Sequence, residues 1–253
     1  MTETEWLECV LPEAMLDHLG TQASTRKTRL FACACVRRVW PLLTDPRLRE
    51  VVALAERSAD ERVPAKQMQQ ARLLVSLLRE ELEEAETRQP NWMTRAARAA
   101  AQAVEALLPA NGAILQTPRD IREPPDVISA TRIARTAGRA IEAQREQRLG
   151  LSPVPADSPR PLEMLDAVEL LREIFGNPFR STTIKPAWLA WNERSIAKMA
   201  RAIYTECRFD DLPILADALE EAGCMDGVML AHCRASMAHV RGCWVVDALL
   251  GMK

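Results

Sequence analysis

Apolar residues recur at helical spacing through most of the chain, and this period constrains the fold more than any other feature. Between Pro64 and Arg88, for example, Met68, Ala71 and Leu78 fall on one side of a helix, and charged residues fill the other side. Strong helix formers such as Ala, Leu, Arg and Glu make up much of the sequence, whereas only 4% of the residues are aromatic. The alternation of β-branched and aromatic residues that marks strands is scarce. The sequence therefore predicts an all-α fold, a multi-helix bundle of roughly ten helices.

Two Pro-rich segments interrupt the helical pattern. Residues 109–125 read PANGAILQTPRDIREPP and have no helical period, which predicts a surface loop or lid. Residues 150–161 are rich in Pro and Ser and predict a linker or loop. We expect an N-terminal helical bundle over 1–149 and a C-terminal helical part over 162–253; one continuous domain with a long excursion is the alternative.

Charge and composition limit the kinds of partner and the cellular compartment that we expect for the protein. With 33 basic and 35 acidic residues, the formal net charge is -2, which removes the overall electrostatic argument for a nucleic acid or an anionic membrane as partner. The first residues, MTETEWLECV, are acidic where a signal peptide is basic, and no stretch approaches the roughly 18 apolar residues of a membrane helix. We expect a cytoplasmic protein with no membrane association, whose seven Cys are reduced thiols.

A local basic segment lies over residues 25–43. Its centre is apolar on nearly every side, so this helix should cross the core, and we expect Cys33 and Cys35 to be core thiols rather than a metal pair. The apolar centre is flanked by five cations, which form either a phosphate-binding face for nucleic acid or the solvated ends of a buried helix. These cations are Arg26, Lys27, Arg29, Arg37 and Arg38.

Established catalytic motifs are absent from the sequence. It has no Gly-rich phosphate loop, no HExxH, no GxSxG and no paired CxxC, and it contains only nine Gly. The leading interpretation is a non-enzymatic helical module for protein interaction or regulation, which binds another protein and needs no cofactor. Arg37, Arg38, Arg241 and Trp244 are candidate binding residues, the last two as an anion contact and a stacking face.

The stretch from position 224 to 243 concentrates residues that could ligate a metal. Five of the ten Cys and His residues of the chain fall there: Cys224, His232, Cys233, His239 and Cys243. If residues 238–250 form a helix, His239 and Cys243 lie one turn apart on one face, a spacing that offers two ligands to one ion. Thiolates and imidazoles are the donors that zinc prefers, so the stretch is a candidate structural zinc site.

Two other interpretations of this stretch stay open. In the first it is ordinary core, with Met225, Val228 and Met229 on an apolar helix face and His232 hydrogen-bonded at its edge. In the second the protein is a zinc- or thiol-dependent enzyme. Its nucleophile would be Cys243 or Cys233, its base His239 or His232, and its orienting acid Asp247.

Four longer phrases occur together in the chain: RLFACAC at 29–35, LLREIFGNPFR at 170–180, LPILADALEEAGC at 212–224 and HVRGCWVVD at 239–247. In these phrases and their order the chain resembles a family of uncharacterised bacterial proteins. The resemblance implies a bacterial context, and it brings no activity, cofactor or partner with it. This chain departs from the family at 234–238, reading RASMA, where relatives typically have a Gly/Pro-rich turn.

Overall fold

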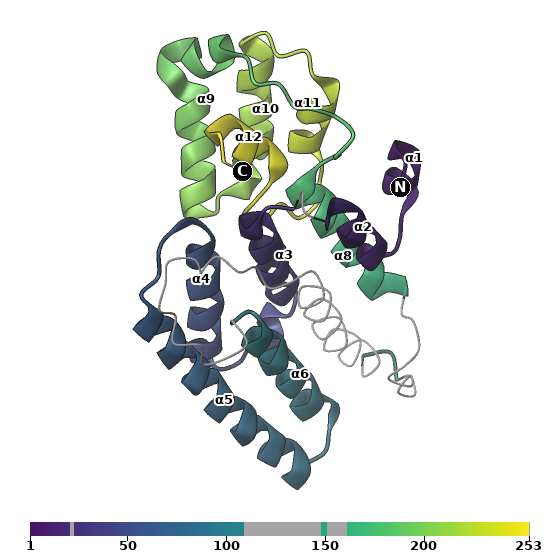
Figure 1. Ribbon diagram of the computed structural model, residues 1–253, viewed down its shortest axis with the longest axis vertical. Helices are drawn as coiled ribbons and strands as arrows, with labels where there is room; N and C mark the ends of the chain where they lie inside the picture. Colours follow the sequence, from purple (N-terminus) through teal and green to yellow (C-terminus); the bar gives the residue numbers. More distant parts are fainter. Residues whose placement is uncertain (21–22, 109–147, 151–160, 253) are drawn as a thin grey trace. The chain divides into compact units, whose positions relative to one another are not determined.

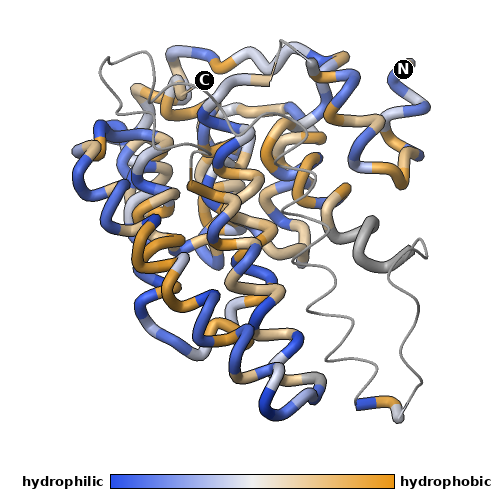
Figure 2. The backbone as a smooth tube through the Cα atoms, turned by 60° about the horizontal axis from the view of Figure 1, so that its bottom comes forward, coloured by the Kyte–Doolittle hydropathy of each residue, from blue (hydrophilic) through white to orange (hydrophobic). Residues whose placement is uncertain are grey.

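The computed structural model describes residues 1–20, 23–108, 148–150 and 161–252 (Figure 1). These residues form 11 α-helices and no strand, which confirms the all-α prediction. Hydrophobic and hydrophilic stretches follow one another along the helices, as expected for helices with one apolar side (Figure 2). The predicted loop at 109–125 and nearly all of the predicted linker at 150–161 lie outside the described residues. None of the helices in the described ranges is long and apolar enough to span a membrane.

The chain divides into two compact units. The N-terminal unit comprises Met1 and Glu5–Leu171, and the C-terminal unit comprises Thr2–Thr4 and Arg172–Lys253. Helix α8 (Pro161–Phe175) begins in the first unit, and its last turn belongs to the second. The division at residue 172 follows the packing of the described residues, and the predicted boundary at 150–161 stays a prediction.

Helix α3 (Thr25–Arg37) forms the centre of the N-terminal unit. Its residues from Leu30 to Val36 are all buried, as the apolar sequence predicts, and they include Cys33 and Cys35. Ser24 caps the helix by accepting a hydrogen bond from the Lys27 amide. The helices that pack around α3 or around its neighbours are α4 (Pro46–Asp60), α5 (Ala65–Arg88) and α6 (Trp92–Ala106). The short helices α1 (Glu3–Glu8) and α2 (Pro12–Leu19) precede them.

Three cations of the predicted basic face of α3 bind groups on α4. Arg26 Nε lies 2.7 Å from Asp60 Oδ1, and Arg29 donates to the Ser58 carbonyl at 2.7 Å. Arg37 makes a bidentate pair with Glu56, whose side chain is buried. These three side chains therefore link α3 to α4. Neither of the two interpretations from the sequence, a phosphate-binding face or solvated helix ends, includes this role.

A capping box begins helix α6, and it gives a measurable contribution to stability. Asn91 Oδ1 accepts from the Thr94 amide at 3.0 Å, and Thr94 Oγ1 accepts from the Asn91 amide at 3.2 Å. We expect Asn91→Ala to lower the free energy of unfolding by about 1 kcal/mol, because the cap acceptor is lost. Urea unfolding followed by circular dichroism checks this value. Asn91→Ser keeps an acceptor and should retain most of the stability; an equal loss in both variants would show that the cap is not the cause.

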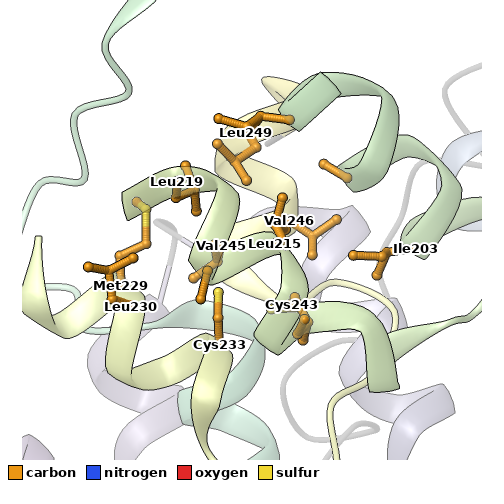
Figure 3. Close-up of a cluster of buried hydrophobic side chains, with 14 of the residues drawn as sticks. Ile203, Leu215, Leu219, Met229, Leu230, Cys233, Cys243, Val245, Val246 and Leu249 are labelled. Atoms are coloured by element: carbon orange, nitrogen blue, oxygen red, sulfur yellow. The ribbon is translucent and has the colours of Figure 1, made fainter. Parts of the chain in front are cut away.

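The C-terminal unit contains α9 (Pro186–Glu206), α10 (Leu212–Glu221), α11 (Gly227–Arg234) and α12 (Trp244–Leu250). Helix α10 packs against both α9 and α11, and α12 packs against α9. Figure 3 shows side chains of their shared core, including Ile203, Leu215, Met229, Cys233 and Cys243. All of these side chains are fully buried or nearly so.

One expectation for this unit was wrong. The sequence of residues 177–192, NPFRSTTIKPAWLAWN, predicts an extended segment that ends with Asn192 capping a helix, but α9 begins at Pro186 and already includes the buried Trp188. Pro is well suited to the first turn of a helix. At the predicted start of the helix, α9 is kinked instead. Its residues Asn192, Glu193 and Arg194 have positive φ values of 44°, 55° and 65°.

Candidate metal centre

Four side chains that can ligate a metal converge in the C-terminal unit. Glu173 lies in the last turn of α8, His232 lies near the end of α11, and His239 and Cys243 lie in the segment that joins α11 to α12. We call Glu173, His232, His239 and Cys243 the His/Glu/Cys cluster. One ligand atom from each residue can be chosen so that all four lie within 4.8 Å of one another.

Local signals in the sequence place the helix ends that carry the cluster. Helix α8 ends at Gly176, whose φ of 67° is left-handed and whose amide donates to the Arg172 carbonyl at 2.9 Å. Asp226 caps the start of helix α11 by accepting hydrogen bonds from the amides of Val228 and Met229 at 3.1 Å each. These two ends fix the turns of helix from which Glu173 and His232 project.

Glu173 is the hub of the cluster. Its Oε2 lies 3.1 Å from His232 Nε2 and 3.0 Å from His239 Nδ1, and its Oε1 accepts from the Val240 amide at 3.4 Å. His232 Nε2 also lies 3.3 Å from Cys243 Sγ. A single carboxylate thus binds both histidines, and one of these histidines contacts the thiol.

The cluster lies away from solvent, and burial sets its electrostatics. The side chain of Glu173 is 0% exposed, and that of His239 is 6% exposed. Burial opposes the charge of Glu173, but the hydrogen bonds from His232 and His239 outweigh it, so the pKa of Glu173 lies below its ordinary value. Burial, reinforced by the nearby charge of Glu173, raises the pKa of Cys243 well above that of a free thiol. Without a cation the cluster therefore holds an ionised carboxylate and a protonated thiol.

Hydrogen bonding inside the cluster leaves one buried atom unsatisfied. Nε2 of His239 is buried and has no hydrogen-bond partner among the described residues. An unpaired buried polar atom typically costs about 1–3 kcal/mol. The polar network is therefore incomplete as a purely structural device.

The separations within the cluster suit a small four-coordinate ion. Zinc bonds of about 2.0 Å to nitrogen or oxygen and about 2.3 Å to sulfur place tetrahedral ligand atoms roughly 3.3–3.8 Å apart. The two distances from His232 Nε2, 3.1 Å to Glu173 and 3.3 Å to Cys243, are already near this range. The His/Glu/Cys cluster could therefore hold a metal ion.

The structure brings together three of the five predicted ligands and leaves two apart from the group. His232, His239 and Cys243 belong to the cluster, whereas Cys224 and Cys233 are buried among the apolar side chains of the unit. Burial raises the pKa of Cys233 to about 12, so this thiol is protonated like an ordinary core cysteine. Cys224 and Cys233 thus lie outside the cluster, in the same buried core as Cys243.

The reason given for pairing His239 with Cys243 was wrong. We expected both on one face of a helix over 238–250, but α12 begins only at Trp244, and residues 235–243 are not helical. Gly242 has a φ of 93°, which a right-handed helix does not allow. A turn brings His239 to the Glu173 carboxylate and Cys243 to the His232 ring instead. The core interpretation of α11 was also partly wrong, because Met225 is 93% exposed and Val228 is exposed, although Met229 is buried.

Sequence reasoning missed Glu173, the residue that the other three surround. A signal for it exists in the helix period. Leu170 is buried, and Glu173 follows three residues later on the same side of the helix. An acid on the buried face of an amphipathic helix requires a buried partner, and the nearby Cys/His stretch supplies it.

The four candidate binding residues have contacts of their own. Arg37 lies over the Trp40 ring, 4.6 Å from its centroid, in addition to its pair with Glu56, and Arg38 caps the end of α3. Arg241 lies over the Tyr204 ring at 5.3 Å. The Trp244 ring lies 5.1 Å from the His232 ring. The sequence prediction that these residues bind a partner stays a prediction.

No protein-family model, curated protein or solved structure matches this chain. The cluster itself defines the kind of site present: a buried group of one carboxylate, two imidazoles and one thiol that could hold a metal ion.

Proposed function

We propose that the C-terminal unit binds one zinc ion in the His/Glu/Cys cluster and that the protein is a zinc-stabilised, non-enzymatic helical module. The observation that carries this proposal is the convergence of four donors within 4.8 Å on one buried point. Imidazole nitrogen, thiolate sulfur and carboxylate oxygen are all common zinc ligands. The presence of a sulfur and two nitrogens disfavours magnesium and calcium, which bind oxygen.

Charge supports a divalent cation in this position. Zinc binding deprotonates a cysteine ligand, so the bound cluster would contain one thiolate, one carboxylate and two neutral imidazoles. Their two negative charges balance the ion. A buried assembly without net charge avoids most of the cost of placing an isolated charge in the interior.

The burial of the ligands supports a structural role over a catalytic one. Four protein ligands complete the tetrahedral sphere of zinc, whereas a catalytic zinc keeps a position open for water or substrate. Glu173 and Cys243 are both fully buried. The enzyme alternative that uses a free thiol has little support, because the raised pKa of Cys243 keeps the unmetallated thiol protonated near neutral pH.

Zinc content tests the proposal directly. Protein purified without a metal-affinity tag is expected to contain about one zinc per chain by elemental analysis. Cys243→Ser should reduce this to less than about 0.1 equivalent, because the sulfur ligand is lost. Cys233→Ser is the matched control: it changes another fully buried cysteine of the same core and should keep its zinc. Less than about 0.1 equivalent in the wild-type protein, after incubation with zinc and removal of the excess, would refute zinc binding.

A further inference from the structure

The indole of Trp244 contacts the metal cluster through His232. Trp244 follows Cys243 directly and begins α12. Its ring centroid lies 5.1 Å from that of His232, with the planes at 53°, and the His232 ring lies 4.9 Å from the His239 ring at 72°. Both separations are typical of favourable aromatic pairs. Three rings thus form a packed row that ends at the two histidine ligands.

The end of α8 also packs against this indole. A Cβ atom on Gly176 would lie 3.1 Å from Cγ and 3.3 Å from Cδ2 of Trp244, closer than side chains normally approach. Gly176 also has a φ of 67°, which disfavours any other residue. Position 176, directly after α8 and three residues after Glu173, therefore favours glycine for two reasons: the positive φ and the close approach of its backbone to the indole.

No described residue hydrogen-bonds to the second ring nitrogen of His232, Nδ1, to orient the ring. Metal-ligating histidines usually donate their second ring nitrogen to a carboxylate or carbonyl, which fixes the ring. The described residues provide no hydrogen-bond partner for Nδ1 of His232, whose polar contacts all involve Nε2. The χ2 torsion of histidine is broad, so the orientation of the ring depends on packing as well as on the contacts of Nε2.

We propose that Trp244 is the positioning residue of the zinc site: its indole, packed against the α-carbon of Gly176, holds the His232 ring with Nε2 directed at Glu173 and Cys243. This inference rests on the proposed zinc binding and deepens it. It gives Trp244 a stacking role that differs from the one predicted from the sequence, because its partner is a histidine of the same chain. The indole acts through His232 and does not touch the ion.

Zinc affinity and the spectrum of the cobalt-substituted protein test this role. We expect Trp244→Leu to weaken zinc binding about ten- to a hundredfold, the usual range for residues that orient a ligand. Affinity is measured by competition with a chelating dye. The absorption bands of bound Co²⁺ should also shift, because they report the ligand geometry. Trp244→Phe retains a ring against His232 and should bind zinc within about fivefold of the wild-type protein.

Trp188→Leu is the matched control. It removes another indole packed in the core of the same unit, so it should lower the unfolding temperature and leave both zinc affinity and the cobalt spectrum unchanged. If Trp244→Leu does not fold, Gly176→Ala displaces the indole from the other side and should weaken zinc binding in the same way.

The outcomes separate the two proposals. Wild-type affinity and an unchanged cobalt spectrum in Trp244→Leu or, where that variant does not fold, in Gly176→Ala would overturn the positioning role while leaving zinc binding intact. An equal loss of affinity in Trp188→Leu would overturn it as well, since any loss of core packing would then suffice. Absence of zinc binding by the wild-type protein in the same titration would refute the proposed function itself.

Discussion

Replacing Glu173 with alanine is expected to abolish zinc binding and to destabilise the C-terminal unit by about 3–5 kcal/mol, the range found when one partner of a buried charged network is removed. The carboxylate is fully buried and accepts hydrogen bonds from both cluster histidines and from the Val240 amide. Its removal leaves these donors without an acceptor in a site that water does not fill readily. A typical domain is stable by only about 5–15 kcal/mol, so this loss is a large fraction of the total.

Glu173→Gln separates the loss of charge from the loss of volume. The amide has nearly the shape of the carboxylate and retains one acceptor oxygen, so we expect a smaller loss of stability than in Glu173→Ala. Zinc binding should still fall strongly, because a neutral amide is a poor zinc ligand and leaves the dication unbalanced. Stability that falls while zinc affinity remains at the wild-type value in Glu173→Gln would show that Glu173 is a hydrogen-bonding residue and not a ligand.

Hydrogen exchange locates the effect of Glu173→Ala. Peptides from 227–250 should lose protection, because α11 and the segment after it are held by this carboxylate. Peptides from α3 and α4 should exchange as in the wild-type protein, since Glu173 belongs to the C-terminal unit. Uniform loss of protection throughout the chain would contradict a role confined to the cluster.

The helices could be predicted because their determinants are local. The residues PEAMLDHL at 12–19, with a Pro in the first turn and Gly20 after them, predict a short helix, and α2 spans Pro12–Leu19. The burial of α3 follows from its apolar residues, and α9 is kinked at the place where a helix capped by Asn192 was predicted to begin. Propensity, capping and period act over a few residues, so they can be recognised without knowing the tertiary packing.

The candidate site could be predicted only in part because its assembly is not local. Cysteines 224, 233 and 243 look alike in the sequence, and all three are buried in one core; only the fold shows that Cys243 alone among them lies in the His/Glu/Cys cluster. Glu173 lies far from the stretch in sequence and reaches it through the fold of the C-terminal unit. His239 and Cys243 do lie in one cluster, but a turn at Gly242 replaces the helix that was expected to bring them together. The residue types in the sequence indicated a possible metal site, and long-range contacts in the fold determine which residues lie in the cluster.

Removal of zinc from the wild-type protein is expected to lower the unfolding temperature of the C-terminal unit by on the order of 20 °C. A ligand present at a thousand times its dissociation constant stabilises the folded state by about 4 kcal/mol, and each kcal/mol moves the midpoint of a domain this size by about 4–8 °C. The ion would join the end of α8, α11 and the segment before α12, so its loss releases three elements at once. Thermal unfolding with and without a chelator measures the shift.

Two cysteine variants show whether the shift comes from this cluster. Cys243→Ser should unfold at the temperature of the chelated protein and should not respond to the chelator, because it has no zinc to lose. Cys233→Ser changes an equally buried cysteine outside the cluster, so it should be less stable than the wild-type protein and still respond fully to the chelator. A chelator response that persists in Cys243→Ser would place the ion elsewhere. A wild-type protein without any response would mean that Glu173 and its two histidines stabilise the unit by hydrogen bonds alone, at the cost of the unpaired Nε2 of His239.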